Sequence, residues 1–540
     1  MDEILASARR VIIERLKSLL DAKIAGRDAT EVAVWLMIIV YTIVFSYFTI
    51  MKHNAFRSFA WDLGIVNQAL STTLNSGKFL YYTPELFFNL SGCYFGLHFS
   101  PVLILLLPIY SIYPGAEVLL VFQSSMIALG ALPLYWFASE RLKNNLVAAG
   151  FSLAYILYPI LHGANWFDFH IQCMLPVFFF SAMYHLEQES WTKYFVFTFL
   201  ALAVGESVSL VVFFMGVYGI LKYRSLLSRA IGQRKLDSKK VLIPIVTLIV
   251  STIWFLASKW IQNSFFPVDP AFMDYYKAVD WWSVLGIAGD PIRMPIHILL
   301  NPLRVAQALT YDAYLKLLYF VLAFGSLLFL PFKSSVTLIT LPVLLPAFLS
   351  NYSPFYMLGV HYPLYYIPFL FLATVEGAKK YKNGEGTAII KGRIKSILMI
   401  LVIFSLFASP LSPLLNTMEV PIPHFSDYSL PIVSEHETIL QGVIALVPSN
   451  VSILTQNNIF PHFSNRLEAY VYPLPHVFDF APREAREYVD QIMLKSEYVL
   501  VDTGYDRETA LHIISDVTRR YEGFTVLRYE DGIYLYKRDL

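Results

Sequence analysis

The chain has 540 residues, of which 56% are hydrophobic and only 15% are charged, and its mean hydropathy is +0.54. Soluble domains carry about 25% charged residues, so this composition excludes an ordinary soluble domain and indicates a polytopic membrane protein. The net charge of +1 gives no indication of nucleic-acid binding, and the two cysteines form no metal-binding or redox pattern.

The N-terminal segment, residues 1–31, mixes basic and acidic side chains, and no cleavage-like site follows the apolar run 32–51 after it. It therefore predicts a cytosolic helix rather than a signal peptide. The next run, residues 32–51, has no charged side chain and is long enough to cross a bilayer as one helix.

Three basic clusters determine the predicted orientation, because basic loops stay in the cytosol. They lie at 141–143, 222–240 and 379–395. Keeping all three inside predicts about eleven crossings within residues 32–415, with the N-terminus inside and the C-terminus outside. The expected spans are 32–51, 116–138, 145–162, 171–186, 194–205, 207–221, 241–259, 317–332, 336–350, 362–376 and 397–415.

Two long loops, 52–100 and 260–316, then fall outside. The apolar, proline-broken segments 101–114 and 297–312 are expected to lie along the outer membrane face.

The last part of the chain, residues 425–540, has a different pattern. Val451–Thr455 and Tyr498–Asp502 are typical of buried strands, and 483–494 and 507–521 have helical periodicity. The segment 524–537 predicts a hairpin around Asp531-Gly532. We expect a small extracytoplasmic α/β domain.

Polar side chains interrupt the apolar sequence at a few places, which the predicted topology puts at the outer membrane surface. Ionisable groups there are costly to desolvate and mark functional sites by default. They are Asp62, Asp168 with His170, Glu206, and the histidines His98 and His361.

Each of these side chains also has a structural alternative. Asp62 could cap a helix over 63–74, and Asp168 with His170 could form a solvated turn. Glu206 could bond to its own turn, and His361 and His98 could belong to an interfacial aromatic belt.

Several motifs together resemble domain-of-unknown-function family 2079, a family of predicted membrane proteins. They are WDLGIVNQA (61–69), LHFSP (97–101), YPILH (158–162), FDFH (167–170), GESV (205–208), GVHY (359–362), PFLF (368–371) and TQNNIFPHFSNR (455–466). The chain departs from the family pattern in two places. Trp61 stands where the family usually has Phe, and the turn 204–207 lacks the usual Lys-Glu-Asp.

That family resembles the GT-C glycosyltransferases, such as the protein mannosyltransferases and aminoarabinose transferases. The resemblance implies a polytopic GT-C-like fold, a polyprenyl-phosphate-sugar donor, an inverting displacement and a catalytic Asp in the first external loop. Only Asp62 maps onto that motif.

The resulting hypothesis is a glycosyltransferase of the plasma membrane in which Asp62 takes the proton of an acceptor hydroxyl. Candidate contacts of the donor phosphate are Arg57, Arg293, His361 and His98. Asp168, His170 and Glu206 could hold a divalent cation such as Mg²⁺ or Mn²⁺. An aromatic groove of Phe87, Phe88, Tyr94 and Phe95 could admit the lipid.

Two alternatives from other classes remain open. In a non-enzymatic lipid or solute transporter the same acids would couple ions, although no repeated halves are visible in the sequence. A membrane assembly factor without catalysis is the other, and the altered turn at 204–207 keeps it open.

Overall fold

The structure is a computed structural model that describes residues 27–225, 239–270, 280–287, 293–385, 387–417 and 427–539, together with 23–24 and 424. Residues 1–22 of the expected N-terminal helix, and residues 226–238 of the expected basic loop, lie outside the described residues.

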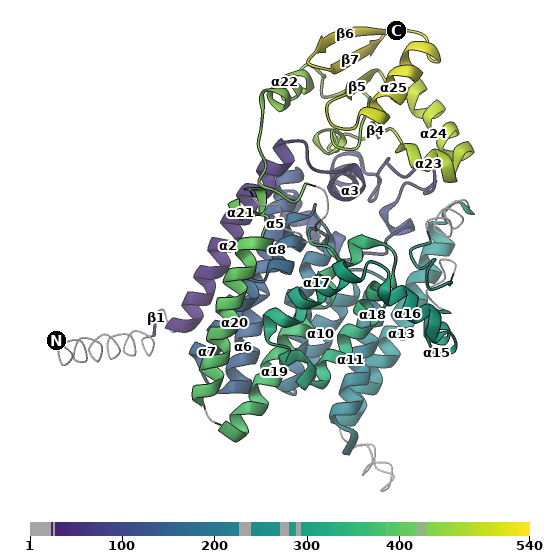
Figure 1. The fold of residues 1–540 in the computed structure, drawn as a ribbon. Helices are drawn as coiled ribbons and strands as arrows, with labels where there is room; N and C mark the ends of the chain where they lie inside the picture. Colours follow the sequence, from purple (N-terminus) through teal and green to yellow (C-terminus); the bar gives the residue numbers. More distant parts are fainter. Residues whose placement is uncertain are drawn as a thin grey trace, which may run out of the picture.

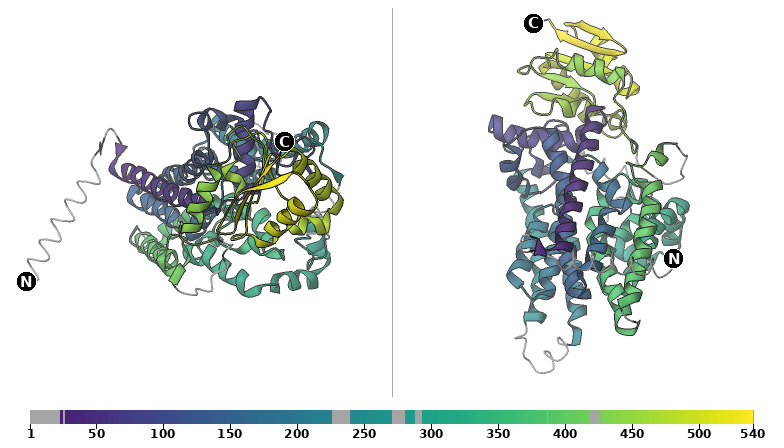
Figure 2. Two further views of the ribbon diagram at one scale, coloured as in Figure 1. Left: turned by 90° about the horizontal axis from the view of Figure 1, so that it is seen from above. Right: turned by 90° about the vertical axis from the view of Figure 1, so that its left-hand side faces the viewer.

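The described chain forms a helical bundle with a smaller domain stacked on one end (Figures 1 and 2). We call the smaller part, residues 427–539, the tail domain. The first half of the bundle contains α2 (Ala29–Asn54), α3 (Ile65–Ser76), α4 (Leu103–Tyr110), α5 (Ala116–Leu129), α6 (Ala131–Leu142), α7 (Asn145–Ile156), α8 (Pro159–Trp166), α9 (Leu175–Glu187), α10 (Trp191–Leu202) and α11 (Val208–Lys222). The second half contains α13 (Lys239–Phe265), α15 (Met294–Leu300), α16 (Pro302–Thr310), α17 (Ala313–Phe324), α18 (Leu341–Leu349), α19 (Ile367–Glu385), α20 (Thr387–Ala408) and α21 (Pro413–Thr417).

A helix overlaps each expected span, but few helices are long enough to cross a membrane unaided. Among the described residues, Ala29–Asn54, Ala116–Leu142 and Lys239–Phe265 are long and apolar enough, and up to five spans result if each of two bent helix pairs counts as one. The other apolar helices are shorter than the roughly 20 residues that a bilayer requires. Residues 191–202 and 208–222, for example, form helices of 12 and 15 residues. The structure therefore supports a polytopic helical protein with fewer clear spans than the eleven expected.

Proline explains part of this shortening. Pro159 separates α7 from α8, and the two helices meet at a bend of 47°. A proline ring clashes with the preceding turn and removes one backbone donor, so an apolar run breaks there into two short helices. The segments expected to lie along the membrane face also form short helices, and Leu299 and Leu303 on α15 and α16 are 81% and 72% exposed.

The tail domain contains a five-stranded sheet in the order β4-β3-β5-β7-β6. Its strands are β3 (Ile453–Thr455), β4 (Ala469–Val471), β5 (Tyr498–Asp502), β6 (Phe524–Glu530) and β7 (Ile533–Arg538), and its helices are α22 (Glu435–Ile444), α23 (Pro475–Phe480), α24 (Pro482–Lys495) and α25 (Arg507–Arg519). β3 is parallel to β4 and β5, whereas β7 is antiparallel to β5 and β6. The expected hairpin is present, with positive φ at both turn residues, Asp531 and Gly532.

The tail domain is attached to the bundle through α3 and the loop before it. Asn67 donates to Ser464 and to Asn465 at 2.7 Å each, and Gln68 donates to the Arg466 carbonyl at 3.0 Å. These partners lie in the segment TQNNIFPHFSNR (455–466), so one of the motifs in the sequence forms the joint between the two parts.

At the opposite end of the bundle, ion pairs join four helices. Arg141 at the end of α6 contacts Glu187 of α9 at 3.0 Å and also pairs with Glu376 of α19. Lys222 of α11 completes the group by pairing with Glu187.

Candidate functional site

Asp62 lies in η1 (Ala60–Gly64), a π-helical turn between α2 and α3. Such turns are frequent at functional sites because they displace one residue from regular helix geometry. The Ala60 N–H donates to the side chain of Asn457 at 2.8 Å, so the tail domain holds the start of this turn. Neither η1 nor α3 has a side-chain cap, so the helix-capping alternative for Asp62 finds no support.

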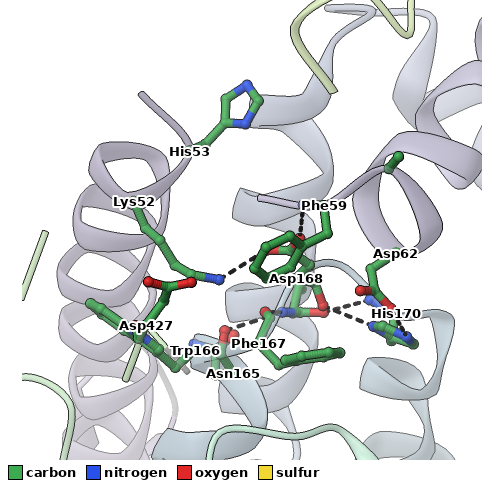
Figure 3. Close-up of polar contacts among 12 residues, drawn as sticks. Lys52, His53, Phe59, Asp62, Asn165, Trp166, Phe167, Asp168, His170 and Asp427 are labelled. Carbon is green, nitrogen blue, oxygen red and sulfur yellow. Dashed lines mark hydrogen bonds and ion pairs between the residues drawn. The ribbon is translucent and has the colours of Figure 1, made fainter. Parts of the chain in front are cut away.

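His170 is the ionic partner of Asp62, with 3.2 Å between Nε2 and Oδ1 (Figure 3). The other ring nitrogen, Nδ1, lies 2.9 Å from the Asp168 carbonyl oxygen. A carbonyl can only accept, so Nδ1 carries a proton. His170 therefore links the Asp62 carboxylate to the backbone of Asp168.

Asp168 is almost completely buried and both of its carboxylate oxygens are occupied. Lys52 donates to Oδ1 at 2.9 Å, and the Phe59 N–H donates to Oδ2 at 2.5 Å (Figure 3). Burial raises the pKa of Asp168, and the Lys52 ammonium opposes that shift. This side chain therefore joins the end of α2, the loop before Asp62 and the turn that carries His170.

His361 stacks on His170, with ring centroids 3.7 Å apart and planes at 11°. Burial, together with His170 and His98 nearby, holds the pKa of His361 well below its ordinary value, so its ring is neutral. Nδ1 of His361 is buried and has no hydrogen-bond partner among the described residues. It is a free polar atom beside the Asp62–His170 pair.

Asp62 and His361 both line a cavity of about 480 Å³ between the bundle and the tail domain. The bundle contributes aromatic side chains, including Trp61, Phe87 and Tyr362. The tail domain contributes Asn457, His476 and Tyr505, among others. Cavities of this size, with mostly apolar walls and a few polar groups, are typical of binding sites for small molecules.

Glu85 is a second acid in this cavity, and sequence reasoning missed it. Burial raises its pKa from 4.5 to about 7, against the hydrogen bond from Tyr82, and the Asp62 charge adds to the shift. Tyr82 donates to Glu85 at 2.5 Å. The sequence did hold a signal, since Asp62 and Glu85 are the two acids in the loop 52–100.

Other predicted site residues lie outside the cavity lining. Arg57 donates to Ser429 at 3.3 Å, and Arg293 begins α15. Glu206 lies 3.3 Å from Lys259 and accepts from the Phe99 N–H at 3.1 Å. His98 is exposed and lies within electrostatic range of Glu206, Lys259 and Asp62.

The expected aromatic groove is divided between two places. Phe87 and Phe88 are buried, line the cavity and pack against the core of the tail domain. Tyr94 and Phe95 are buried in the core of the bundle. The four rings therefore do not form one open groove for a lipid.

The donor set expected for a divalent cation does not fit one. Both oxygens of Asp168 accept hydrogen bonds, and Glu206 pairs with Lys259. Within the described ranges, no three His, Cys, Asp or Glu side chains are grouped as metal ligands. The metal site stays a sequence-based prediction.

Comparison with known proteins gives two findings. The chain superposes on the crystal structure of ArnT from Cupriavidus metallidurans bound to undecaprenyl phosphate with a TM-score of 0.46 and 10% sequence identity, over 92% of this chain and 97% of that one. No curated protein sequence matches it. The profile of the family described as "Predicted membrane protein (DUF2079)" matches residues 52–535, a range that contains Asp62, Glu85, His170 and the tail-domain joint. The chain therefore belongs to the DUF2079 family of predicted membrane proteins.

Proposed function

We propose that this protein is a membrane glycosyltransferase that moves a sugar from a polyprenyl-phosphate donor to a hydroxyl group, with Asp62 as the general base. The observation that carries the proposal is the position of Asp62. Its carboxylate is held by His170 at 3.2 Å and lines the cavity between bundle and tail domain. Asp62 also maps onto the catalytic aspartate of the first external loop that the sequence resemblance to the GT-C enzymes implies.

The reaction needs a base because a neutral hydroxyl is a weak nucleophile. One Asp62 oxygen contacts His170, and the described residues show no hydrogen bond to the other. That oxygen would take the acceptor proton while the acceptor oxygen forms a bond to the anomeric carbon. The bond from that carbon to the phosphate oxygen breaks, and the lipid phosphate leaves with the electron pair.

The leaving phosphate gains negative charge, so its site requires hydrogen-bond donors or cations. The bundle supplies such groups near Asp62. His361 offers its unpartnered Nδ1, and the exposed His98 lies within electrostatic range of both Asp62 and Lys259. We assign these groups of the bundle to the donor and the tail-domain wall of the cavity to the acceptor.

This assignment requires the tail domain to be extracytoplasmic and the far end of the bundle to be cytosolic. Both native cysteines are buried, so a single engineered cysteine reports its own position. In intact cells an impermeant maleimide should label His512→Cys in the tail domain and leave Lys143→Cys unlabelled. Labelling of Lys143→Cys alone would reverse the topology and end the proposal.

The proposal is tested by a transfer assay with Asp62→Asn. Membranes that contain the protein are given undecaprenyl phosphate carrying radiolabelled mannose, glucose or galactose, and release of label from the lipid phase is measured. Loss of a positioned base typically lowers a rate by about 10²- to 10⁴-fold. Asn keeps the size of Asp62 and can donate its amide proton to Nε2 of His170, so folding should be retained.

Asp490→Asn is the matched control, because Asp490 is a partly exposed acid of the tail domain, outside the cavity lining and paired with Arg520 at 3.1 Å. It should release label at the parent rate. Equal rates for Asp62→Asn and the parent would remove Asp62 as the base. No release from any donor by the parent, in folded protein, would count against a glycosyltransferase and favour the transporter or assembly alternatives.

A further inference from the structure

The cavity beside Asp62 has an uneven distribution of charge. Asp62 and Glu85 both line it, whereas none of the described lining residues is Lys or Arg. Its polar groups on the tail-domain wall are the neutral or weakly basic side chains of Asn457, His476 and Tyr505. A ligand that entered this space would meet two carboxylates and no Lys or Arg among the described lining residues, and only Asp62 has an ionic partner, His170.

The walls are also unusually aromatic. Trp61, Phe87, Phe88, Tyr352 and Tyr362 line the same cavity as the two acids. Flat rings bind the C–H faces of sugars, and carboxylates, amides and imidazoles bind their hydroxyl groups. This combination of rings and polar groups suits a carbohydrate better than an apolar molecule.

We propose that this cavity binds the acceptor, and that the acceptor is a short glycan without negative charge, held between the aromatic wall of the bundle and the tail-domain wall. The inference rests on the proposed function, because it places the acceptor hydroxyl next to Asp62. It adds the chemical class of the acceptor and gives the tail domain a role in choosing it.

Electrostatic repulsion disfavours an acceptor glycan that carries negative charge. Two unit charges about 7 Å apart repel appreciably at the effective dielectric constant of a protein surface, even after screening. A uronate or phosphate group in the cavity would face Asp62, whose charge His170 offsets in part, and Glu85 whenever that carboxyl is ionised. We therefore expect an anionic glycan to bind at least about tenfold more weakly than a neutral one of the same length.

Equilibrium binding tests this without any donor. The full chain, purified in detergent, is titrated with mannotriose, trigalacturonate and a glucosamine trimer, and binding is followed by saturation-transfer NMR. Mannotriose and the glucosamine trimer should bind, and trigalacturonate should bind at least about tenfold more weakly at pH 8. Equal or tighter binding of trigalacturonate would overturn the inference.

Variants identify the site. Glu85→Gln removes one charge but keeps an oxygen that accepts from Tyr82, so it should narrow the gap between trigalacturonate and mannotriose several-fold. His476→Ala should weaken mannotriose binding, because His476 lines the cavity from an exposed position. His512→Ala, at another exposed histidine of the tail domain, is the matched control and should bind like the parent. Parent-like mannotriose binding by His476→Ala would remove the tail-domain wall from the site.

The two proposals fail differently. If mannotriose binds but no donor releases label, the glycan cavity stands and the transfer reaction does not. If label is released but none of the three trisaccharides binds, the reaction stands and the acceptor inference is wrong. Asp62→Asn separates them further, since it should lose transfer and retain mannotriose binding.

Discussion

Acidic side chains at the two ends of the bundle have opposite surroundings. At the end far from the tail domain, Glu187 and Glu376 share Arg141, and Lys222 adds a second cation to Glu187. At the other end, Asp62 and Glu85 face a cavity whose described lining residues include no Lys or Arg. Acids paired with Arg and Lys hold helices together, whereas acids that line a cavity without Lys or Arg can contact a ligand.

This comparison predicts that substitutions at the far end of the bundle lower stability, whereas substitutions at the cavity end lower activity. Arg141→Met would remove a positive charge that offsets the partly buried carboxylates of Glu187 and Glu376. Breaking a buried pair costs about 3–5 kcal/mol, and because Arg141 is 24% exposed we expect about 2–3 kcal/mol here. The thermal midpoint in detergent should fall clearly, with sugar transfer per folded molecule unchanged.

Arg483→Met is the matched control for that experiment. Arg483 pairs with Glu487 at 2.8 Å, but the two side chains are 80% and 58% exposed. Solvent screens exposed pairs such as this one, so the midpoint should barely move. If Arg141→Met were as mild as Arg483→Met, the ion pairs at the far end would not hold the bundle together.

The second prediction concerns the cavity end and pH. Burial and the Asp62 charge raise the pKa of Glu85 from 4.5 to about 7, so between these values the folded protein binds a proton that the unfolded chain has released. Stability therefore falls as pH rises from about 4.5 to 7 and stays low above that. Glu85→Gln should match the parent near pH 5 and exceed it at pH 8 by about 1–2 kcal/mol, reduced from the full shift for partial exposure.

Thermal midpoints of both proteins at pH 5 and pH 8 measure this effect. Glu508→Gln, at an exposed position in the first turn of α25, is the control and should give the same small difference at both pH values. If the thermal midpoint of Glu85→Gln equalled that of the parent at both pH values, burial in the cavity would not raise the pKa of Glu85.

Sequence patterns predicted most strands and two helices of the tail domain, but not β4, α22 or α23, and they predicted the number of crossings less well. The tail-domain strands and helices follow short-range periodicity, which the sequence carries directly, and β5 matches its expected bounds. The number of crossings depends on how interrupted apolar runs such as 302–310 and 313–327 are arranged, and that pair bends by 79°. No local pattern fixes such an angle.

The site could be predicted only in part for a related reason. Asp62, Asp168, His170 and His361 interrupt apolar or aromatic sequence, and the structure brings all four together. The sequence did not show which acids would face the cavity and which would be buried in structural contacts. Asp168 is buried by Lys52 and the Phe59 backbone, whereas Glu85 enters the cavity through the fold of the loop 77–100. These are long-range contacts that spacing along the chain does not encode.

The smallest effect that we predict tests whether the tail domain shapes the cavity end. Gly64 lies two residues after Asp62, and a Cβ there would stand 2.7 Å from Cδ1 of the buried Phe460 ring. Gly64→Ala should therefore push the tail-domain joint away from η1. Overpacking of this kind costs about 1–3 kcal/mol, and since a ring can shift we expect about 1 kcal/mol, with a fall in transfer because Asp62 and Asn457 move relative to each other.

Two further variants make this result specific. Gly442 lies in α22 of the tail domain, and a Cβ there meets nothing within 4 Å. Gly442→Ala should therefore be neutral or slightly stabilising. Adding Phe460→Leu to Gly64→Ala should restore transfer by making room, which a double-mutant cycle measures as coupling between the two sites. If Gly64→Ala transferred sugar at the parent rate, close contact between η1 and the tail domain would not matter for catalysis. The cavity would then depend on the bundle alone.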